Sequence, residues 1–273
     1  MSLAQVEPIA DAVLFEGYLL YPYRPTALKN RHRWCFGVLA CRADAEAAGG
    51  RSPWRSRSES LLVGGEETEI EVVLRFLHPV RRRVLRRTPA AAPAGRRETA
   101  AEVESLQVGD RWLEPGEEAA EVRVESGPLR LRELLREPLR RSFACAGGRE
   151  VEEVPSPGAG SEVALVRERR ELEGVLEIRA EAVDQGAFRL AIEVSNVSPA
   201  PSAAGADADD ERARSFLSTH WLVLAREGRL VSLLDPPPEL AAASGSCRNV
   251  GVWPVLVGEP DGAAVLCSPI LLE

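Results

Sequence analysis

This chain of 273 residues has no net positive charge, very little lysine and no long apolar run. The formal net charge is −8 and the pI is about 5.2. We therefore expect no nucleic-acid partner, because phosphate binding needs a clustered positive surface. No apolar stretch approaches the roughly 20 residues that a membrane-spanning helix requires, so no membrane association is expected either.

Lysine occurs once, at Lys29, against 33 arginines. Together with 20 prolines and abundant alanine, this bias is typical of a GC-rich coding background. The arginine content is therefore not taken as a sign of guanidinium chemistry.

The five cysteines are widely spaced and odd in number, and no C-x-x-C pair occurs among them. The first 15 residues lack the basic region and the long apolar region of a secretory signal peptide. We therefore expect a cytoplasmic protein with free thiols.

Short apolar segments bounded by glycine and proline dominate the chain and predict antiparallel hairpins. With 45% hydrophobic residues, the chain can bury a sizeable core. Hairpins are expected at 58–63 with 67–77, 175–183 with 188–197, 215–225 with 229–234, and 252–257 with 263–266. Further strands are expected at 13–20 and 34–40, and one clear helix at 128–143.

These segments predict a single mainly β domain over residues 10–273. The expected architecture is a two-sheet sandwich or a partly closed barrel of antiparallel hairpins with one or two short helices. Mobile loops are expected near 86–104, 146–160 and 199–211, where Pro, Ala, Gly and charged residues gather.

The motifs of common enzyme classes are absent. No Walker A sequence, G-x-G-x-x-G sequence or nucleophile elbow occurs. Ser218, His220 and Asp235 lie close in sequence, but a strand with polar residues is the better interpretation of this group than a catalytic triad. We therefore assign no catalytic residues and no cofactor.

A metal site is the alternative that the cysteines and histidines leave open. His32 and Cys35 have H-x-x-C spacing, and the residues that could join them after folding are Cys41, His78, His220, Cys247 and Cys267. Structural zinc usually shows paired close ligands, which are missing here, so buried free cysteine is the preferred interpretation.

A basic run at 81–87 is followed by an acidic region at 102–125. We expect these arginines to form a solvated basic loop opposite the acidic region. An acidic protein partner is an equal alternative, and a phosphate backbone is a third.

The segment 15–37 concentrates six of the fourteen aromatic residues, all three tyrosines and the lone lysine. Its prolines at 22 and 25 would hold a stiff loop, and tyrosine with arginine on such a loop is typical of interaction hot spots. The candidate partner-binding residues are Tyr21, Tyr23, Arg24, Lys29, Asn30, Arg33 and Trp34.

Asn249 and Trp253 are secondary candidates. Asn249 and Gly251 precede a predicted strand that contains Trp253 and Pro254, which is typical of a turn followed by an edge strand or a bulge. Turn chemistry is the preferred interpretation of this stretch.

Four stretches resemble an uncharacterised bacterial family encoded beside NiFe-hydrogenase genes. They are "LFEGYLLYPYRPTALKNRHRWCFGVL", "FLSTHWLVLAREGRLVSLLDPPPE", "CRNVGVWPVLVGEPDG" and "LCSPILL". The resemblance implies a non-enzymatic accessory role, in which the protein contacts a hydrogenase subunit or a maturation factor during assembly, maturation or stabilisation. The competing hypothesis is a metal carrier or small-molecule enzyme built from converged Cys and His residues.

Overall fold

The computed structural model of the protein describes residues 3–15, 36–47, 49–50, 52–88, 99–155, 162–184, 186–200, 208–258 and 262–269. Strands dominate these residues, so the predicted mainly β class is confirmed. Within the same ranges, no helix has both the length and the apolarity to cross a membrane.

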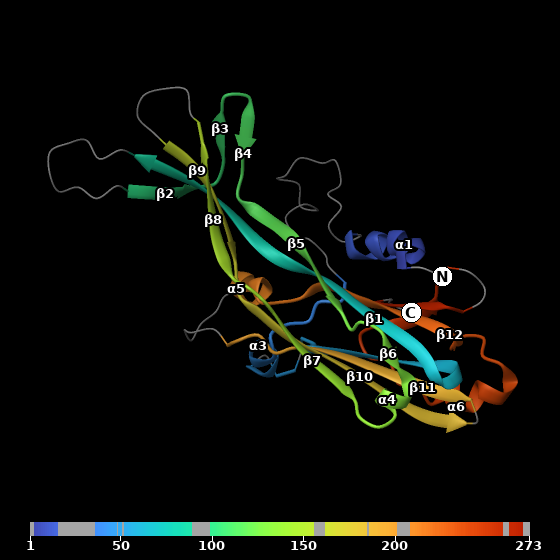
Figure 1. The fold of residues 1–273 in the computed structure, drawn as a ribbon. Coiled ribbons are helices and arrows are strands. Elements are labelled where there is room, and N and C mark those ends of the chain that lie inside the picture. Colours follow the sequence, from blue (N-terminus) through green and yellow to red (C-terminus); the bar gives the residue numbers. More distant parts are fainter. Residues whose placement is uncertain are drawn as a thin grey trace.

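One very long strand, β1 (Arg55–Thr88), organises the molecule and runs along most of its length (Figure 1). Its middle part alternates as the sequence predicted, with Ile70, Val72, Leu74 and Phe76 all fully buried in the main core. Side chains on one face of a strand recur every second residue, so this face of β1 lies against the core.

The neighbours of β1 change along its length. Residues 55–63 pair with β11 (Ala187–Asn196). From Glu69 onwards, the partners are β6 (Leu129–Arg130) and then β5 (Gly116–Glu125). The sheet therefore divides into two leaves that enclose the core, which is sandwich-like and not a closed barrel.

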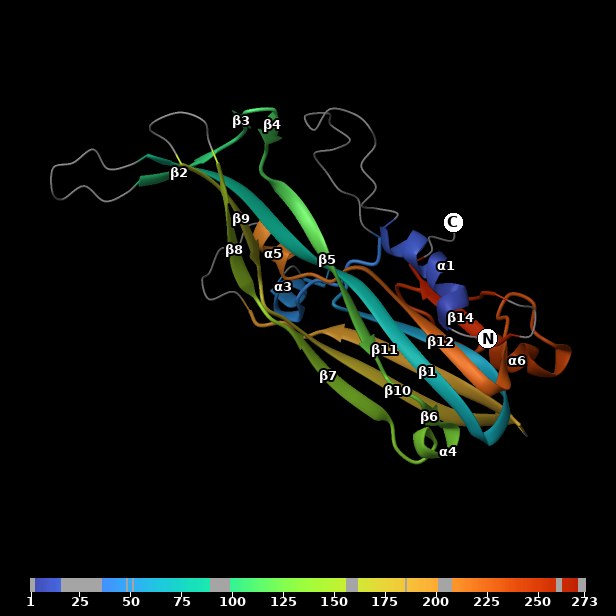
Figure 2. The same cartoon turned by 45° about the horizontal axis from the view of Figure 1, so that its top comes forward.

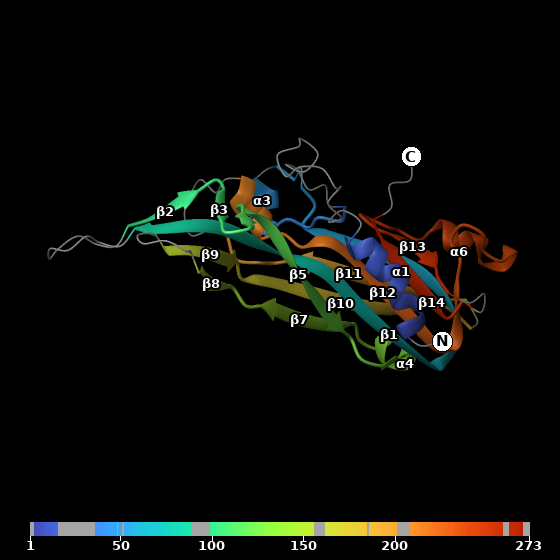
Figure 3. The same cartoon turned by 90° about the horizontal axis from the view of Figure 1, so that it is seen from above.

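The main strand order is β13-β14-β12-β1-β11-β10-β7. Seen from above, β7 and β10 lie on one side of β1 and β13 and β14 on the other (Figure 3). The remaining bounds are β7 (Leu139–Cys145), β10 (Leu172–Asp184), β12 (Leu217–Val231), β13 (Trp253–Leu256) and β14 (Ala264–Ser268).

The far end of β1 forms an arm that projects from the main body (Figure 1). There β1 pairs with β2 and β9, and β9 pairs with β8. A small separate sheet of β3 and β4 lies at the same end. The bounds are β2 (Thr99–Val103), β3 (Leu106–Val108), β4 (Arg111–Leu113), β8 (Gly148–Val154) and β9 (Glu162–Arg169).

Helices are few and short, apart from α1 (Leu3–Phe15), which lies across β12 and β14 (Figure 2). Val6 and Ala10 of α1 are fully buried against Leu222 and Leu266 of these strands. The others are α3 (Arg42–Ala47), α4 (Leu131–Leu134), α5 (Ala208–Ala213), the 3-10 turn η1 (Pro238–Leu240) and α6 (Ala241–Gly245).

The helix predicted over 128–143 is wrong. Only α4, a single turn, is helical there, while β6 precedes it and β7 follows it. Leu131 and Leu134 have helical spacing and are buried, but Pro138 cannot continue a helix and the next residues pair with β10.

Two predicted hairpins, 58–77 and 215–234, are also wrong, because β1 and β12 are each continuous through these segments. Residues 65–68 instead form an insertion in β1 opposite Glu227. Thr68 closes this insertion, since its hydroxyl donates to the Glu227 carbonyl at 2.9 Å. The hairpins predicted at 175–197 and 252–266 are confirmed as β10–β11 and β13–β14.

Other predicted boundaries differ from the structure. Strand β8 occupies part of the expected loop at 146–160, β1 and β2 occupy parts of 86–104, and α5 begins within 199–211. The strand expected at 13–20 is helix α1 up to Phe15, and its remainder lies outside the described residues. Within 36–40, only a single bridge from Leu39 to Phe216 forms.

A buried cation and imidazole lie between α1 and the sheet. Arg75 is almost fully buried and forms ion pairs with Asp11 of α1 and with Glu121 of β5. The neighbouring His220 is fully buried, and its Nδ1–H donates to the Ser218 carbonyl at 2.8 Å. Burial lowers the pKa of His220 to about 4, and the positive charge of Arg75 acts in the same direction.

His220 should therefore make the fold sensitive to acid. The unfolded chain binds a proton on this imidazole near pH 6.5, whereas the folded chain does so only near pH 4, so stability falls as the pH drops between these values. The unfolding free energy of the wild-type chain should fall by about 2–3 kcal/mol more over this window than that of His220→Gln, measured by urea denaturation at each pH.

His78→Gln is the matched control. His78 is also buried and also has a pKa lowered by burial, and its Nε2–H donates to the Arg170 carbonyl at 2.8 Å. A pH dependence unchanged by His220→Gln, or removed equally by His78→Gln, would contradict the assignment.

Candidate functional site

A pocket of about 510 Å³ lies where the beginnings of β1, β12 and β13 meet the end of β14. Its walls are mostly apolar, with a few polar side chains. The lining residues are Phe36, Gly37, Val38, Leu39, Pro53, Ser56, Thr219, Asn249, Gly251, Val252, Trp253 and Pro269.

One wall is the segment 36–39, which is held by backbone hydrogen bonds to β12. The amides of Ser218 and Thr219 donate to the carbonyls of Phe36 and Gly37, both at 3.0 Å. Gly37 has a φ of +60°, and a Cβ there would lie 2.9 Å from both Pro269 Cγ and the Thr219 carbonyl oxygen. Only glycine therefore allows this close approach without strain.

A bulge at the start of β12 directs Thr219 into the pocket lining. Arg75 faces His220 and Leu77 faces Leu217, so two residues of β12 oppose one residue of β1. Ser218, the first of the two, has a φ of 52°, which is unusual for a residue with a Cβ. Bulges re-aim side chains next to functional sites, and strained backbone gathers there too.

The opposite wall is the segment 249–253, which lies along the start of β1. Arg57 and Val250 exchange two backbone hydrogen bonds of 2.9 and 2.8 Å. The side-chain oxygen of Asn249 accepts from the Glu59 amide at 2.8 Å, which fixes the orientation of its side chain. Trp253 follows as the first residue of β13.

Three lining residues carry buried polar atoms without a hydrogen-bond partner: Thr219 Oγ1, Asn249 Nδ2 and Trp253 Nε1. The indole N–H and the amide NH₂ can only donate, whereas the hydroxyl can donate or accept. Most buried polar groups in proteins are paired, so these three unpaired atoms are exceptions, and each has less than 1 Å² of accessible surface.

Chemically, the pocket is equipped to bind. Among the described lining residues, none has a carboxylate, imidazole, thiol or charged group. The arrangement can hold an apolar body, but its described lining offers no general acid, general base or charged nucleophile.

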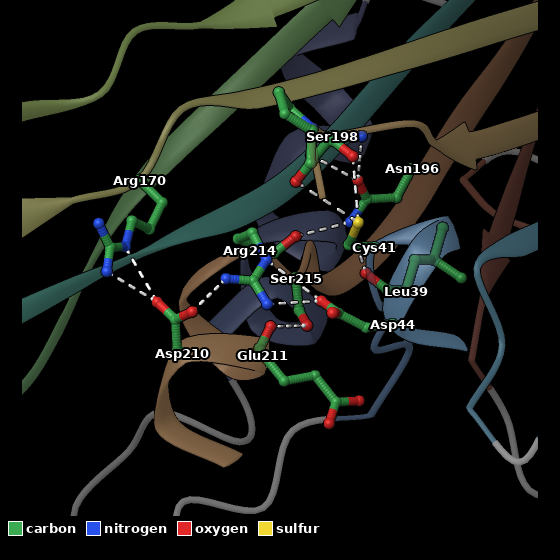
Figure 4. A network of polar contacts seen from close by, with 11 residues as sticks. Leu39, Cys41, Asp44, Arg170, Asn196, Ser198, Asp210, Glu211, Arg214 and Ser215 are labelled. Carbon is green, nitrogen blue, oxygen red and sulfur yellow. Dashed lines mark hydrogen bonds and ion pairs between the residues drawn. The ribbon is translucent and has the colours of Figure 1, made fainter. Parts of the chain in front are cut away.

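A polar network behind the first wall fixes Leu39 (Figure 4). The Asn196 amide donates to the carbonyls of Leu39 and Arg214 at 2.9 and 2.8 Å. Its oxygen accepts from the backbone amide and the hydroxyl of Ser198. One buried side chain thus joins β11, the pocket wall and the chain entering β12.

Ion pairs extend this network to α3 and α5 (Figure 4). Arg214, almost fully buried, pairs with Asp44 of α3 at 2.9 Å and with Asp210 of α5. Asp210 also accepts from Arg170. Although burial alone would raise the pKa of Asp210, hydrogen bonds from Arg214 and Arg170 hold it below its usual value.

Most sequence-predicted site residues lie outside the described residues, namely Tyr21, Tyr23, Arg24, Lys29, Asn30, Arg33 and Trp34. The two secondary candidates, Asn249 and Trp253, are brought together in the pocket. Gly251 between them has a φ of +77°, in keeping with the predicted turn before β13.

The metal candidates do not form a described site. His220 is buried beneath α1, whereas the Cys247 thiol contacts the Ala243 carbonyl after α6. His32 and Cys35 lie outside the described ranges, and within those ranges no group of three or more His, Cys, Asp or Glu side chains could hold a metal ion. Burial raises the pKa of the Cys247 thiol, which disfavours the thiolate that binds metal.

The other sequence motifs have structural roles. The ring of His220 bonds to the backbone of Ser218 and not to its hydroxyl, and Asp235 is exposed beyond β12, so these residues form no triad. The four described cysteines are free.

The basic run at 81–87 lies in the arm, where it is strand and not loop. As expected, it faces carboxylates of the acidic region: Arg82 pairs with Glu118 at 2.8 Å and Arg83 with Glu102 at 3.6 Å. Burial alone would raise the pKa of Glu118, but hydrogen bonds from Arg167 and Arg82 lower it. These arginines therefore have partners within the fold.

All four stretches that carry the family resemblance contribute to the pocket. The first supplies residues 36–39, the second Thr219, the third residues 249–253 and the fourth Pro269. Sequence reasoning missed Phe36, Gly37, Thr219 and Pro269, because no spacing pattern connects them. The only sequence signal they share is membership of these stretches.

A comparison of the chain with protein-family models gives no match, and a comparison with curated proteins gives none either.

Gly37→Ala should destabilise the fold and close the pocket. The added Cβ needs a disfavoured positive φ and collides with Pro269 and the Thr219 backbone. We expect a loss of about 2–4 kcal/mol in unfolding free energy by urea denaturation. The control is Gly109→Ala in the β3–β4 turn, where φ is +59° but nothing lies within 4 Å of the new Cβ. Equal losses in the two variants would contradict the proposed close approach.

Asn196→Ala should loosen the pocket wall as well as the fold. It leaves the Arg214 carbonyl and the Ser198 amide without their partner and removes one of the two hydrogen bonds to the Leu39 carbonyl, so we expect a loss of about 3 kcal/mol in unfolding free energy. Hydrogen exchange should accelerate at the amides of Leu39 and Phe216, which pair with each other. Gln107→Ala, on an exposed strand of the arm, should change neither quantity.

Proposed function

We propose that the protein is a non-enzymatic accessory protein that binds another protein through this pocket. The partner we propose is a NiFe-hydrogenase subunit or one of its maturation factors. The observation that carries the proposal is the convergence of all four resembling stretches on one pocket.

The chemistry of the pocket supports binding over catalysis. Its described lining combines apolar side chains with neutral hydrogen-bond donors and has no titratable group. Such sites, mostly apolar with a few placed polar groups, are typical of ligand and partner recognition. The candidate residues at 21–34 directly precede the pocket residue Phe36 in the chain, so they belong to the same proposed interface.

The rigidity of the walls also supports a binding role. Both walls are fixed by backbone hydrogen bonds, and the Asn196 network holds one of them from behind. A preformed site loses less conformational entropy when a partner binds, which raises affinity.

A capture experiment tests the proposal. The wild-type chain, immobilised and exposed to a lysate of a hydrogenase-bearing host, should retain a hydrogenase subunit or maturation factor. The Thr219→Val, Trp253→Phe double variant should retain about tenfold less, because it loses two donors but keeps the volume of the pocket almost unchanged. Trp112→Phe is the control, since Trp112 is 59% exposed on the arm.

Two outcomes would contradict binding through the pocket, and a third would contradict the hydrogenase link. One is capture of hydrogenase components that the double variant does not weaken. The other is a stoichiometric metal in the purified protein that Cys247→Ser or His220→Gln removes, which would instead favour a metal carrier. Normal hydrogen uptake and normal large-subunit processing in a deletion strain would remove the hydrogenase link itself.

A further inference from the structure

We infer that the outer edge of β8, in the arm, binds a second copy of this chain. The β8 strands of the two copies pair antiparallel about a two-fold axis at Val151. This surface is separate from the pocket, so the inference goes beyond the proposed function and does not depend on it.

The edge of β8 is open among the described residues. β8 pairs with β9 on one side, and no other described strand pairs with it. Every second residue of such an edge strand directs its N–H and C=O groups away from the sheet, where another strand can bind them. Five of the seven residues of β8 are exposed, so this edge is accessible along most of its length.

Val151 lies at the middle of this edge. Its side chain is 43% exposed, whereas its register partner on β9, Val166, is fully buried. The two valines lie on one face of the sheet, because directly opposed residues of an antiparallel pair share a face. A further strand along β8 would extend this apolar row and remove the exposed valine from water.

The order of the charges selects a second copy of the same strand. In a symmetric antiparallel pair, opposed residues share a face only if one residue lies opposite its own copy. With Val151 in that position, Arg149 of each copy faces Glu153 of the other, which gives two pairs of opposite charge. Centring the pair on Glu150 or Glu152 would instead place two identical carboxylates opposite each other.

The Arg149 guanidinium has donors to spare for this contact. It pairs with Glu168 of β9 at 3.3 Å, yet its side chain remains 55% exposed. A guanidinium carries five N–H donors, so it can bind Glu168 and a carboxylate of the second copy together. Glu153 is exposed and lies on the same face of β8 as Arg149, because residues four apart in a strand share a face.

The other two glutamates of β8 are neutralised within each copy. Glu150 and Glu152 oppose each other across the proposed pair, on the opposite face of the sheet. Glu150 already pairs with Arg169 at 3.5 Å, and Glu152 pairs with Arg167 at 2.9 Å. The hydrogen bond from Arg167 holds the pKa of Glu152 below its usual value, so the carboxylate and guanidinium stay charged and paired.

Sedimentation velocity of the full chain tests the inference. We expect a monomer–dimer equilibrium that shifts towards the dimer as the concentration rises to about 0.5 mM, because pairing along one strand is a small interface. Hydrogen exchange at alternate amides of β8 should slow over the same range, since the second copy protects the amides that point outward.

Charge reversal tests the register of the pair. Arg149→Glu and Glu153→Arg should each weaken dimerisation about tenfold, because each places like charges on opposed strands. A mixture of the two variants should restore the dimer, since the introduced glutamate then faces the introduced arginine and the native pair forms once. This recovery also shows that both variants are folded. Arg140→Glu, exposed on the neighbouring strand β7, is the control and should leave dimerisation unchanged.

A chain that stays monomeric up to about 0.5 mM overturns the inference. A dimer that neither charge reversal weakens overturns it as well, because the contact then lies elsewhere on the molecule. Failure of the mixed variants to restore the dimer would contradict the pairing of Arg149 with Glu153.

Discussion

The exchange of hydrogen-bonding partners along β1 is the constraint on which the rest of the structure depends. β1 pairs with β11 over residues 55–63 and with β6 and β5 from Glu69 onwards, so one strand belongs to both leaves of the fold. Ser58 in the first part accepts a hydrogen bond from the Trp221 indole at 3.0 Å, although Trp221 pairs in register with Leu74 in the second part. The core is closed by a single continuous strand that faces itself across the interior.

That closure also creates the pocket. The start of β1 and the start of β12 both lie at the pocket. Two irregular segments complete it: 36–39 forms backbone hydrogen bonds with β12, and 249–253 forms them with β1. The bulge at Ser218 then presents Thr219 to the gap instead of continuing the ladder. Irregular backbone is tolerated here because the Asn196 network and the Arg214 ion pairs satisfy the neighbouring buried groups.

Patterns of neighbouring residues in the sequence predicted the elements that depend mainly on contacts between residues close along the chain. The alternation through Ile70 to Phe76 and the pairing of the β10–β11 and β13–β14 hairpins depend on residues close in sequence, and the structure confirms them. The helix at 128–143 failed because the leucine spacing there covers only one turn, while pairing with β10 determines the rest. Gly64 and Gly65 lie between the two strands of the hairpin predicted at 58–77, but glycine permits a turn and an insertion equally well. Only the pairing of both flanks with β12 distinguishes the two.

The sequence alone determined the mainly β class, two of the hairpins, the opposition of basic and acidic segments, and Asn249 and Trp253 as residues of interest. These follow from alternation, turn residues and charge, which act over short stretches of chain. Tertiary structure alone decided that Phe36, Thr219, Asn249 and Pro269 share one pocket, because contacts between residues so far apart in sequence depend on the partner exchange of β1. It also decided which polar atoms stay unpaired, since that depends on every neighbouring group in the folded chain.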